Sequence, residues 1–237
     1  MNELRYIALE RIPIRRPVDR ISFVADQVRG KTVLDIGALD ETAFRKKQNT
    51  QRWLHREICS VAKQVYGVDN STLIPIEGLC PFPNSVILKG DAYSLETVLD
   101  KTGPVDIVVA GEVIEHLPDS LRFLQSISES KRLKGCEFVL TTPNACSLHN
   151  FHIGLLGMES THIDHLGIHS YKTLNTLCKR AGFEFWEIIP YHVAFSEMIV
   201  SAQLAFKCGV IAFEKWVNLL EWFFPILSGG WVVRGRI

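Results

Sequence analysis

The sequence lacks the signals of several protein classes. Its 26 basic and 26 acidic residues cancel to a formal net charge of zero, so no global positive field attracts nucleic acid. The six cysteines form no C-x-x-C pair, which favours reduced thiols over a disulfide framework. No uncharged apolar run reaches the roughly 18 residues of a membrane span, and charges from Glu3 onward argue against a signal peptide. These absences predict a cytoplasmic protein with no nucleic-acid partner.

The glycine-rich and nucleophile motifs of other enzyme classes are missing too. There is no Walker A motif and no G-x-S-x-G elbow. A strand is expected to end at Gly37, but Leu39 and Phe44 stand where the dinucleotide fingerprint G-x-G-x-x-G has its later glycines. A bulky Leu39 argues against a pyrophosphate seat and therefore against an NAD-type oxidoreductase. Within this strand lies an acid, Asp35, which needs a partner because an unpaired buried charge costs several kcal/mol or more.

Apolar periodicity predicts that strands and helices alternate along most of the chain, and the 47% hydrophobic content supports a full core. The expected strands are 32–37, 64–69, 85–89, 105–110, 136–142, 183–189 and 230–236. The expected helices are 18–28, 51–63, 119–130 and 171–181. This alternation predicts one α/β domain over residues 1–237, with a doubly wound, mostly parallel seven-stranded sheet. The ligand should lie across the carboxyl ends of the first, second and fourth strands.

The apolar segment 191–228, between the last two expected strands, predicts a helical insertion. Four polar residues share one face of a helix there, and most of the remaining circumference is apolar: Lys207, Glu214, Asn218 and Glu221 are the polar set. A helix this apolar should be buried against something. Core packing or a homodimer through 195–224 is the default, and a lid over an apolar substrate or a peripheral contact with the inner membrane surface is the alternative.

Acidic and basic residues mark further candidate contacts. Asp69 ends the second strand, where an acid accepts hydrogen bonds from ribose hydroxyls; a helix N-cap is the alternative. Asp91 follows the third strand and is placed to hydrogen-bond an adenine amino group. Segment 11–20 carries four arginines. It is either a solvated arm or a source of phosphate or carboxylate contacts through Arg15, Arg16 or Arg20.

Six motifs then appear in a characteristic order. They are VLDIGA (33–38), YGVD (66–69), GDA (90–92), VDIVVAGEVIEHLPD (105–119), FVLTTPN (138–144) and L-x-x-L-x-x-x-A-G-F (174–183). Together they resemble class I S-adenosylmethionine-dependent methyltransferases, and most closely the type-11, ubiquinone-biosynthesis-like group. The combination of WLH (53–55), AGEVIEHL and TTPN further resembles methyltransferases that accompany glycosyltransferases in bacterial surface-polysaccharide pathways. The resemblance implies S-adenosylmethionine as cofactor and a small-molecule or lipid-linked glycan hydroxyl as acceptor.

The same resemblance implies cofactor contacts at the matching positions. They are Asp35, Gly37, Ala38 and Asp40 for the methionine end, Asp69 with the adjoining Asn70 for the ribose, Asp91 and Ala92 for the adenine, and Glu112 and Val113 for the sulfonium region. The family usually has a loop of the form G-C-G-x-G, and this chain has Gly-Ala-Leu-Asp-Glu at 37–41. The competing interpretation is a non-catalytic protein that keeps the fold for scaffolding or partner binding.

Methyl transfer to an alcohol also needs a base, and histidine suits neutral pH. His165 matches a position where relatives carry a histidine and is the first candidate. His116 is the second, with a capping or structural role as its alternative. The stretch 149–169 holds five histidines. Because it lacks H-E-x-x-H or paired Cys/His spacing, we expect a substrate loop and no bound metal.

Overall fold

The computed structural model describes residues 4–39, 53–195, 198–199 and 204–237. A seven-stranded sheet runs through it in the order β3-β2-β1-β4-β5-β7-β6. β7 is antiparallel to both of its neighbours and the other pairs are parallel. The strands are β1 Thr32–Ile36, β2 Gln64–Asp69, β3 Ser85–Lys89, β4 Ile107–Gly111, β5 Glu137–Pro143, β6 Phe185–Tyr191 and β7 Gly230–Arg236. The predicted fold class is confirmed.

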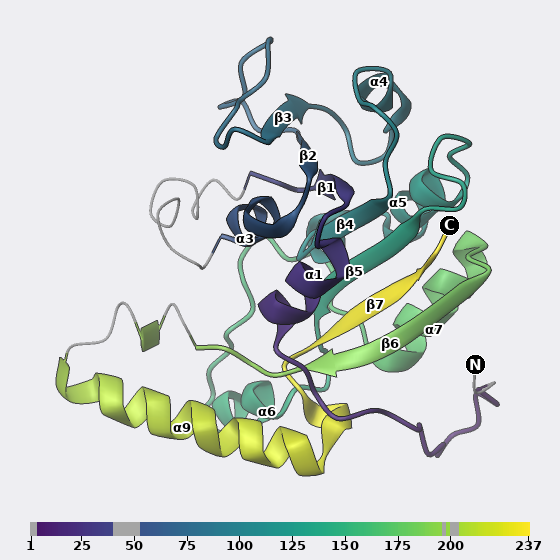
Figure 1. The fold of residues 1–237 in the computed structure, drawn as a ribbon. Helices are drawn as coiled ribbons and strands as arrows, with labels where there is room; N and C mark the ends of the chain where they lie inside the picture. Colours follow the sequence, from purple (N-terminus) through teal and green to yellow (C-terminus); the bar gives the residue numbers. More distant parts are fainter. Residues whose placement is uncertain (1–3, 40–52, 196–197, 200–203) are drawn as a thin grey trace.

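Helices cover both faces of this sheet (Figure 1). They are α1 Arg20–Val28, α3 Leu54–Val61, α4 Glu96–Leu99, α5 Ser120–Ser128, α6 Leu148–Leu155, α7 Tyr171–Ala181 and α9 Leu204–Phe223, with short 3-10 turns η1 Ile114–His116 and η2 Pro225–Leu227. α1 and α3 pack on one face, and α4, α5 and α7 on the other. α9 lies outside these layers, with α6 behind it (Figure 1).

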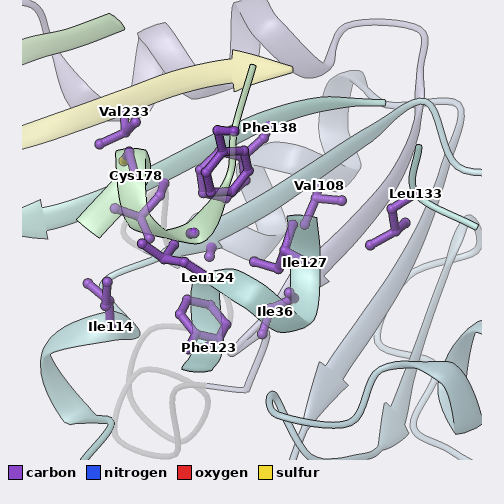
Figure 2. Close-up of a cluster of buried hydrophobic side chains, with 14 of the residues drawn as sticks. Ile36, Val108, Ile114, Phe123, Leu124, Ile127, Leu133, Phe138, Cys178 and Val233 are labelled. Atoms are coloured by element: carbon purple, nitrogen blue, oxygen red, sulfur yellow. The ribbon is translucent and has the colours of Figure 1, made fainter. Parts of the chain in front are cut away.

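Strand alternation separates the core into two parts. In β1, Leu34 and Ile36 face α5 and α7, whereas Val33 faces α1 and α3. Figure 2 shows the larger part, where Phe123 of α5, Phe138 of β5 and Cys178 of α7 lie together. This packing closes the middle of the sheet and leaves the carboxyl ends of β1, β2, β4 and β5 free to carry polar groups.

The element boundaries differ from the sequence-based expectation at two informative places. The strand expected to stop at Ile189 continues through Pro190 to Tyr191. Proline is tolerated there because β6 is the edge strand. α6 was not predicted: it occupies the first half of the histidine-rich stretch and packs on α9, where His152 lies edge-on to Trp216 at 5.2 Å.

The predicted helical insertion includes α9. In this helix acidic side chains contact the rest of the protein, and many large apolar side chains are exposed. The buried Glu221 carboxylate accepts hydrogen bonds from His192 Nδ1 at 2.9 Å and from the Val193 amide, and Glu214 accepts one from the Phe195 amide at 2.6 Å. Large apolar side chains point outward instead: Phe206, Ile211, Phe213, Trp216, Leu219, Trp222 and Phe223. Helix α9 is therefore anchored by its acids and presents its apolar face to the surroundings. No helix in the described ranges is long and apolar enough to cross a membrane.

The acid inside β1 has a buried partner. Asp35 points to the α3 face, and its Oδ2 lies 2.7 Å from Nδ1 of His55. The other ring nitrogen, Nε2, lies 2.7 Å from Oγ of Ser85. Although the residue types match a hydrolase triad, His55 is 1% and Asp35 3% exposed. This network therefore ties β1, α3 and β3 together and is closed to a substrate.

We expect His55→Ala to lower the free energy of unfolding by about 3 kcal/mol or more, because it leaves the Asp35 carboxylate buried without its donor. Ser85→Ala deletes only the outer hydrogen bond and should cost about 1 kcal/mol. Urea denaturation measures both. Equal losses for the two variants would contradict the pairing.

Candidate active site

The turn after β1 is shaped by one glycine and one tryptophan. Gly37 has φ +75°, a conformation that residues with a Cβ rarely adopt. A Cβ there would also lie 2.3 Å from Cγ2 of Val113, which follows β4. Trp53 donates from Nε1 to the Ala38 carbonyl at 3.0 Å. Leu39 is 4% exposed and packs with Trp53 in a small core of its own. The side chain that replaces the usual glycine therefore points into the protein and not into the ligand space.

Asp69, at the end of β2, supports the same turn. Its Oδ2 accepts a hydrogen bond from the Leu39 amide at 3.0 Å, and its Oδ1 accepts one from the Ser71 amide at 2.9 Å. The second bond is a local turn contact like the capping role considered from the sequence. Both oxygens of the half-buried Asp69 are therefore engaged in holding the loops at this edge of the sheet.

The expected adenine contacts lie beyond β3. Asp91 is exposed, and its Oδ1 accepts a hydrogen bond from the Tyr93 amide at 2.9 Å. The Ala92 carbonyl is held by the Ser126 hydroxyl at 2.8 Å. Asn70 is exposed beside Asp69. These residues, Gly37 and Val113 border the same edge of the sheet.

Asp35 and Asp40 were also expected to contact the methionine end of the cofactor. The structure does not support a cofactor contact by Asp35, because alternation in β1 turns its carboxylate to the buried His55. Asp40 lies outside the described residues.

Glu112 is held by partners from three parts of the chain, β5, β6 and α1. Its φ is +56°, an uncommon value for a residue with a side chain that costs of order 1 kcal/mol or more. Its Oε1 accepts hydrogen bonds from Thr141 at 2.9 Å and from the Tyr191 hydroxyl at 3.0 Å, and lies 3.5 Å from Nη1 of Arg20. Burial and the charge of Glu112 raise the pKa of Tyr191 well above its usual value, so it remains a donor. Arg20 thus makes one of the carboxylate contacts considered from the sequence.

The next carboxylate, Glu115, is fully buried in η1. Its Oε2 accepts a hydrogen bond from the Thr142 hydroxyl at 3.1 Å. Its Oε1 is buried and has no hydrogen-bond partner among the residues that the structure describes. Burial first, and then the negative charge of Glu112, raise the pKa of Glu115 to about 9.

Three histidine rings adjoin these carboxylates. The rings of His116 and His165 are 4.6 Å apart between centroids and nearly perpendicular, and His162 lies 5.6 Å from His165. Burial, and next the charges of the other two rings, lower the pKa of His165. Both base candidates from the sequence are therefore brought together. The amide of Leu166 donates to the Glu115 carbonyl at 2.7 Å, which fixes the histidine-bearing loop to η1.

A surface hollow of about 620 Å³ lies elsewhere, between α5, α7 and Tyr6, with Lys172 and Arg180 in its wall. None of the expected cofactor residues lines it. The strand ends carry the acids, the strained Glu112 and the histidine pair, so the chemistry is at the sheet edge and not in this hollow.

Comparison with known proteins identifies the family of this chain. A family model described as a methyltransferase domain matches residues 8–188. No curated protein matches the sequence. The structure resembles an S-adenosylmethionine-dependent methyltransferase from Archaeoglobus fulgidus, with 17% identity, coverage of 92% of this chain and 94% of the other, and a TM-score of 0.50.

Two further solved structures are similar. A possible histamine N-methyltransferase from Thermotoga maritima has 14% identity, coverage of 91% and 86%, and a TM-score of 0.55. Phosphoethanolamine N-methyltransferase 2 from Haemonchus contortus, in complex with S-adenosylmethionine, has 14% identity, coverage of 92% of this chain and 52% of the other, and a TM-score of 0.50.

The chain belongs to the methyltransferase-domain family and is a class I, S-adenosylmethionine-dependent methyltransferase. The site suits that cofactor on its own geometry. Gly37 leaves room beside Val113, where a Cβ would clash, and Asp69 holds the turn that follows Gly37 through the Leu39 amide. The hypothesis of a non-catalytic protein rested mainly on the altered glycine loop. The structure weakens that argument, because Leu39, which replaces the usual glycine, is buried in the protein.

Sequence reasoning missed several residues of the site. Glu115, Thr142 and Tyr191 contact other residues of the site but were not singled out from the sequence. Glu115 and Thr142 lay within quoted motifs, EVIEHL and TTPN, which was the available signal. Tyr191 carried none, because only the packing of β6 brings it to Glu112.

We expect Gly37→Ala to weaken binding of S-adenosylhomocysteine at least tenfold, because the new methyl group meets Val113 and shifts the turn. Gly30→Ala is the matched control: its φ of +71° imposes a similar backbone strain, but no atom lies within 4 Å of its added Cβ. Calorimetry and thermal melts measure both variants. Equal loss of affinity in the two would rule out a specific role for the Gly37 turn.

Proposed function

We propose that this enzyme transfers a methyl group to the hydroxyl of a small molecule or a lipid-linked glycan. The observation that carries the proposal is the group of Glu115, His116 and His165 beside Glu112, at the carboxyl end of β4. The methyl-bearing sulfur of the cofactor belongs near Glu112 and Val113. An acceptor that reaches the histidine pair would then present its oxygen in line with the methyl group, which is where much of the rate enhancement comes from.

The histidines supply the means to remove the hydroxyl proton. His116 and His165 are half-buried, and His162 beside them is exposed, so solvent reaches the pair. Two routes are open: a ring nitrogen takes up the proton, with His165 the first candidate and His116 the second, or a cation held by the rings acidifies the hydroxyl. Both routes require an acceptor oxygen at the same place.

The surface around this site suits a lipid-linked acceptor. Exposed apolar residues of α6, the loop 156–166 and α9 form what we call the α6/α9 apolar surface: Phe151, Leu155, Leu156, Met158, Ile163, Leu166, Phe206, Ile211, Phe213, Trp216, Leu219, Trp222 and Phe223. The loop that carries His162 and His165 is part of it. An acceptor anchored in a lipid layer would therefore meet the site at the rim of this surface.

Cations and tryptophans at the edge of this surface favour a lipid layer over a second copy of the chain. Lys215 is exposed on α9 beside Trp216, and the guanidinium of Arg16 stacks over Trp222 at 4.0 Å. Helices that lie in a membrane interface combine these residue types. We place the enzyme at the cytoplasmic side of the inner membrane as a peripheral protein, and a polysaccharide pathway of the kind expected from the motifs fits that location.

We expect His165→Gln and His116→Gln to lower methyl transfer by about 10²- to 10⁴-fold, because the hydroxyl proton loses its route. Cofactor affinity should stay within a few-fold of the parent protein. The assay follows labelled methyl from S-adenosylmethionine into a panel of sugar, glycan and lipid-extract acceptors. His152→Gln, on α6, is the matched control and should retain activity. Full activity in the His116/His165 double variant, or label on nitrogen acceptors only, would refute the proposal.

Vesicle binding tests the lipid contact. The intact chain should co-sediment with phosphatidylethanolamine–phosphatidylglycerol vesicles, and Leu219→Glu combined with Phe223→Glu should abolish this by placing two charges in the apolar layer. Ile76→Glu is the control, since Ile76 is fully exposed in the loop before β3, outside the α6/α9 apolar surface. If the double variant instead converts a dimer to a monomer and vesicles never bind, the surface is a homodimer interface.

A further inference from the structure

One atom at the active site lacks the partner that its environment demands. Glu115 is 0% exposed, and its Oε1 makes no hydrogen bond to any described residue. The other oxygen, Oε2, is satisfied by Thr142. A buried acceptor without a partner is unfavourable, and it is uncommon enough to need an explanation.

The neighbours of this oxygen are metal-ligating side chains. One ligand atom from each of Glu115, His116 and His165 lies within 4.8 Å of the other two, the one such group in the described part of the chain. The buried Nδ1 of His165 likewise has no hydrogen-bond partner within the described ranges. Bound to one cation, such atoms lie about 2.0–2.2 Å from it and so about 3–4 Å apart. Small rotations about side-chain bonds bring the three atoms from the observed spacing onto one ion.

The backbone holds this group in place before any ion arrives. Glu115 and His116 are consecutive residues of η1. The amides of Leu166 and Gly167 both donate to the Glu115 carbonyl, at 2.7 and 3.2 Å, which pins the residue after His165 to the same turn.

We propose that Glu115, His116 and His165 bind a divalent transition-metal cation, with open coordination positions that accept the hydroxyl of the substrate. Two imidazoles and one carboxylate suit manganese, iron, cobalt or zinc better than magnesium. A structural site would be closed by a fourth protein ligand, whereas here His116 and His165 are half-buried and reach solvent.

The role in the reaction rests on the proposed function. The substrate hydroxyl binds the cation and releases its proton to solvent water, because coordination lowers the pKa of a bound hydroxyl. The oxygen lone pair forms the new bond to the methyl carbon, and the electrons of the carbon–sulfur bond stay on sulfur. The products are the methyl ether, S-adenosylhomocysteine and one proton. The carboxylate of Glu112 is paired with Arg20 and is not part of the proposed ligand group.

Metal binding is measured without cofactor or acceptor, so it stands apart from methyl transfer. The full chain is stripped with EDTA, dialysed and titrated with CoCl2, MnCl2 and ZnCl2, with MgCl2 as the hard-cation comparison. We expect one equivalent of Co²⁺ to bind with a visible absorption band typical of nitrogen and oxygen ligands, and Mg²⁺ to bind more weakly. Glu115→Gln, His116→Gln and His165→Gln should each raise the Co²⁺ dissociation constant at least tenfold.

His152→Gln is the matched control, because it changes a histidine of the same stretch outside the group. Thermal melts in EDTA check that each variant folds. Absence of the cobalt band at millimolar Co²⁺, or binding that survives all three substitutions, would overturn the site. Methyl transfer abolished by EDTA and restored by Mn²⁺ or Co²⁺ would support the catalytic role. A cation that binds while EDTA leaves turnover unchanged would refute that role.

Discussion

The parallel pairing of β4 with β5 is the constraint on which the rest of the site depends. It sets Gly111 opposite Thr141, so the chain leaves β4 directly beside the threonines that end β5. The Glu112 amide then donates to the Thr141 carbonyl, and the hydroxyls of Thr141 and Thr142 donate to Glu112 and Glu115. Both carboxylates are oriented by one strand end, and the strained backbone of Glu112 is stabilised by three partners for its side chain.

The inverted polarity of α9 connects this chemistry to the surface. Helix amphipathicity usually buries the apolar stripe, whereas here Glu214 and Glu221 are bound to the segment after β6 and the aromatic residues face outward. Asn144, which ends the TTPN motif, donates to the carbonyls of Ile226 and Ser228 just beyond the helix. The apolar surface is therefore attached to the strand end that orients the carboxylates, and its position relative to the active site is set by hydrogen bonds.

The sequence predicted the fold closely, because period-two apolar runs and helical spacing report burial directly. It predicted the site less well, for reasons that particular residues illustrate. Leu39 was interpreted only as an argument against a pyrophosphate group, and the sequence did not show that its side chain packs with Trp53. Asp35 was assigned to the cofactor from its motif, although alternation with Leu34 and Ile36 already placed it on the opposite face from them. The motifs identified the segments that border the site. The direction of each side chain then decided which residues can contact a ligand.

By itself, the sequence determined the class of the protein: alternating apolar segments require a parallel sheet, and six ordered motifs mark the methyltransferase family. Only the tertiary structure decided which polar groups act together. Glu115 and His116 come from the turn after β4, and His165 comes from a loop beyond β5 and α6. Because these segments are far apart in the sequence, no local spacing shows that the three side chains lie close together. The physical reason is that strand pairing and the backbone contacts of Glu115 set these distances, and both are formed between residues far apart along the chain.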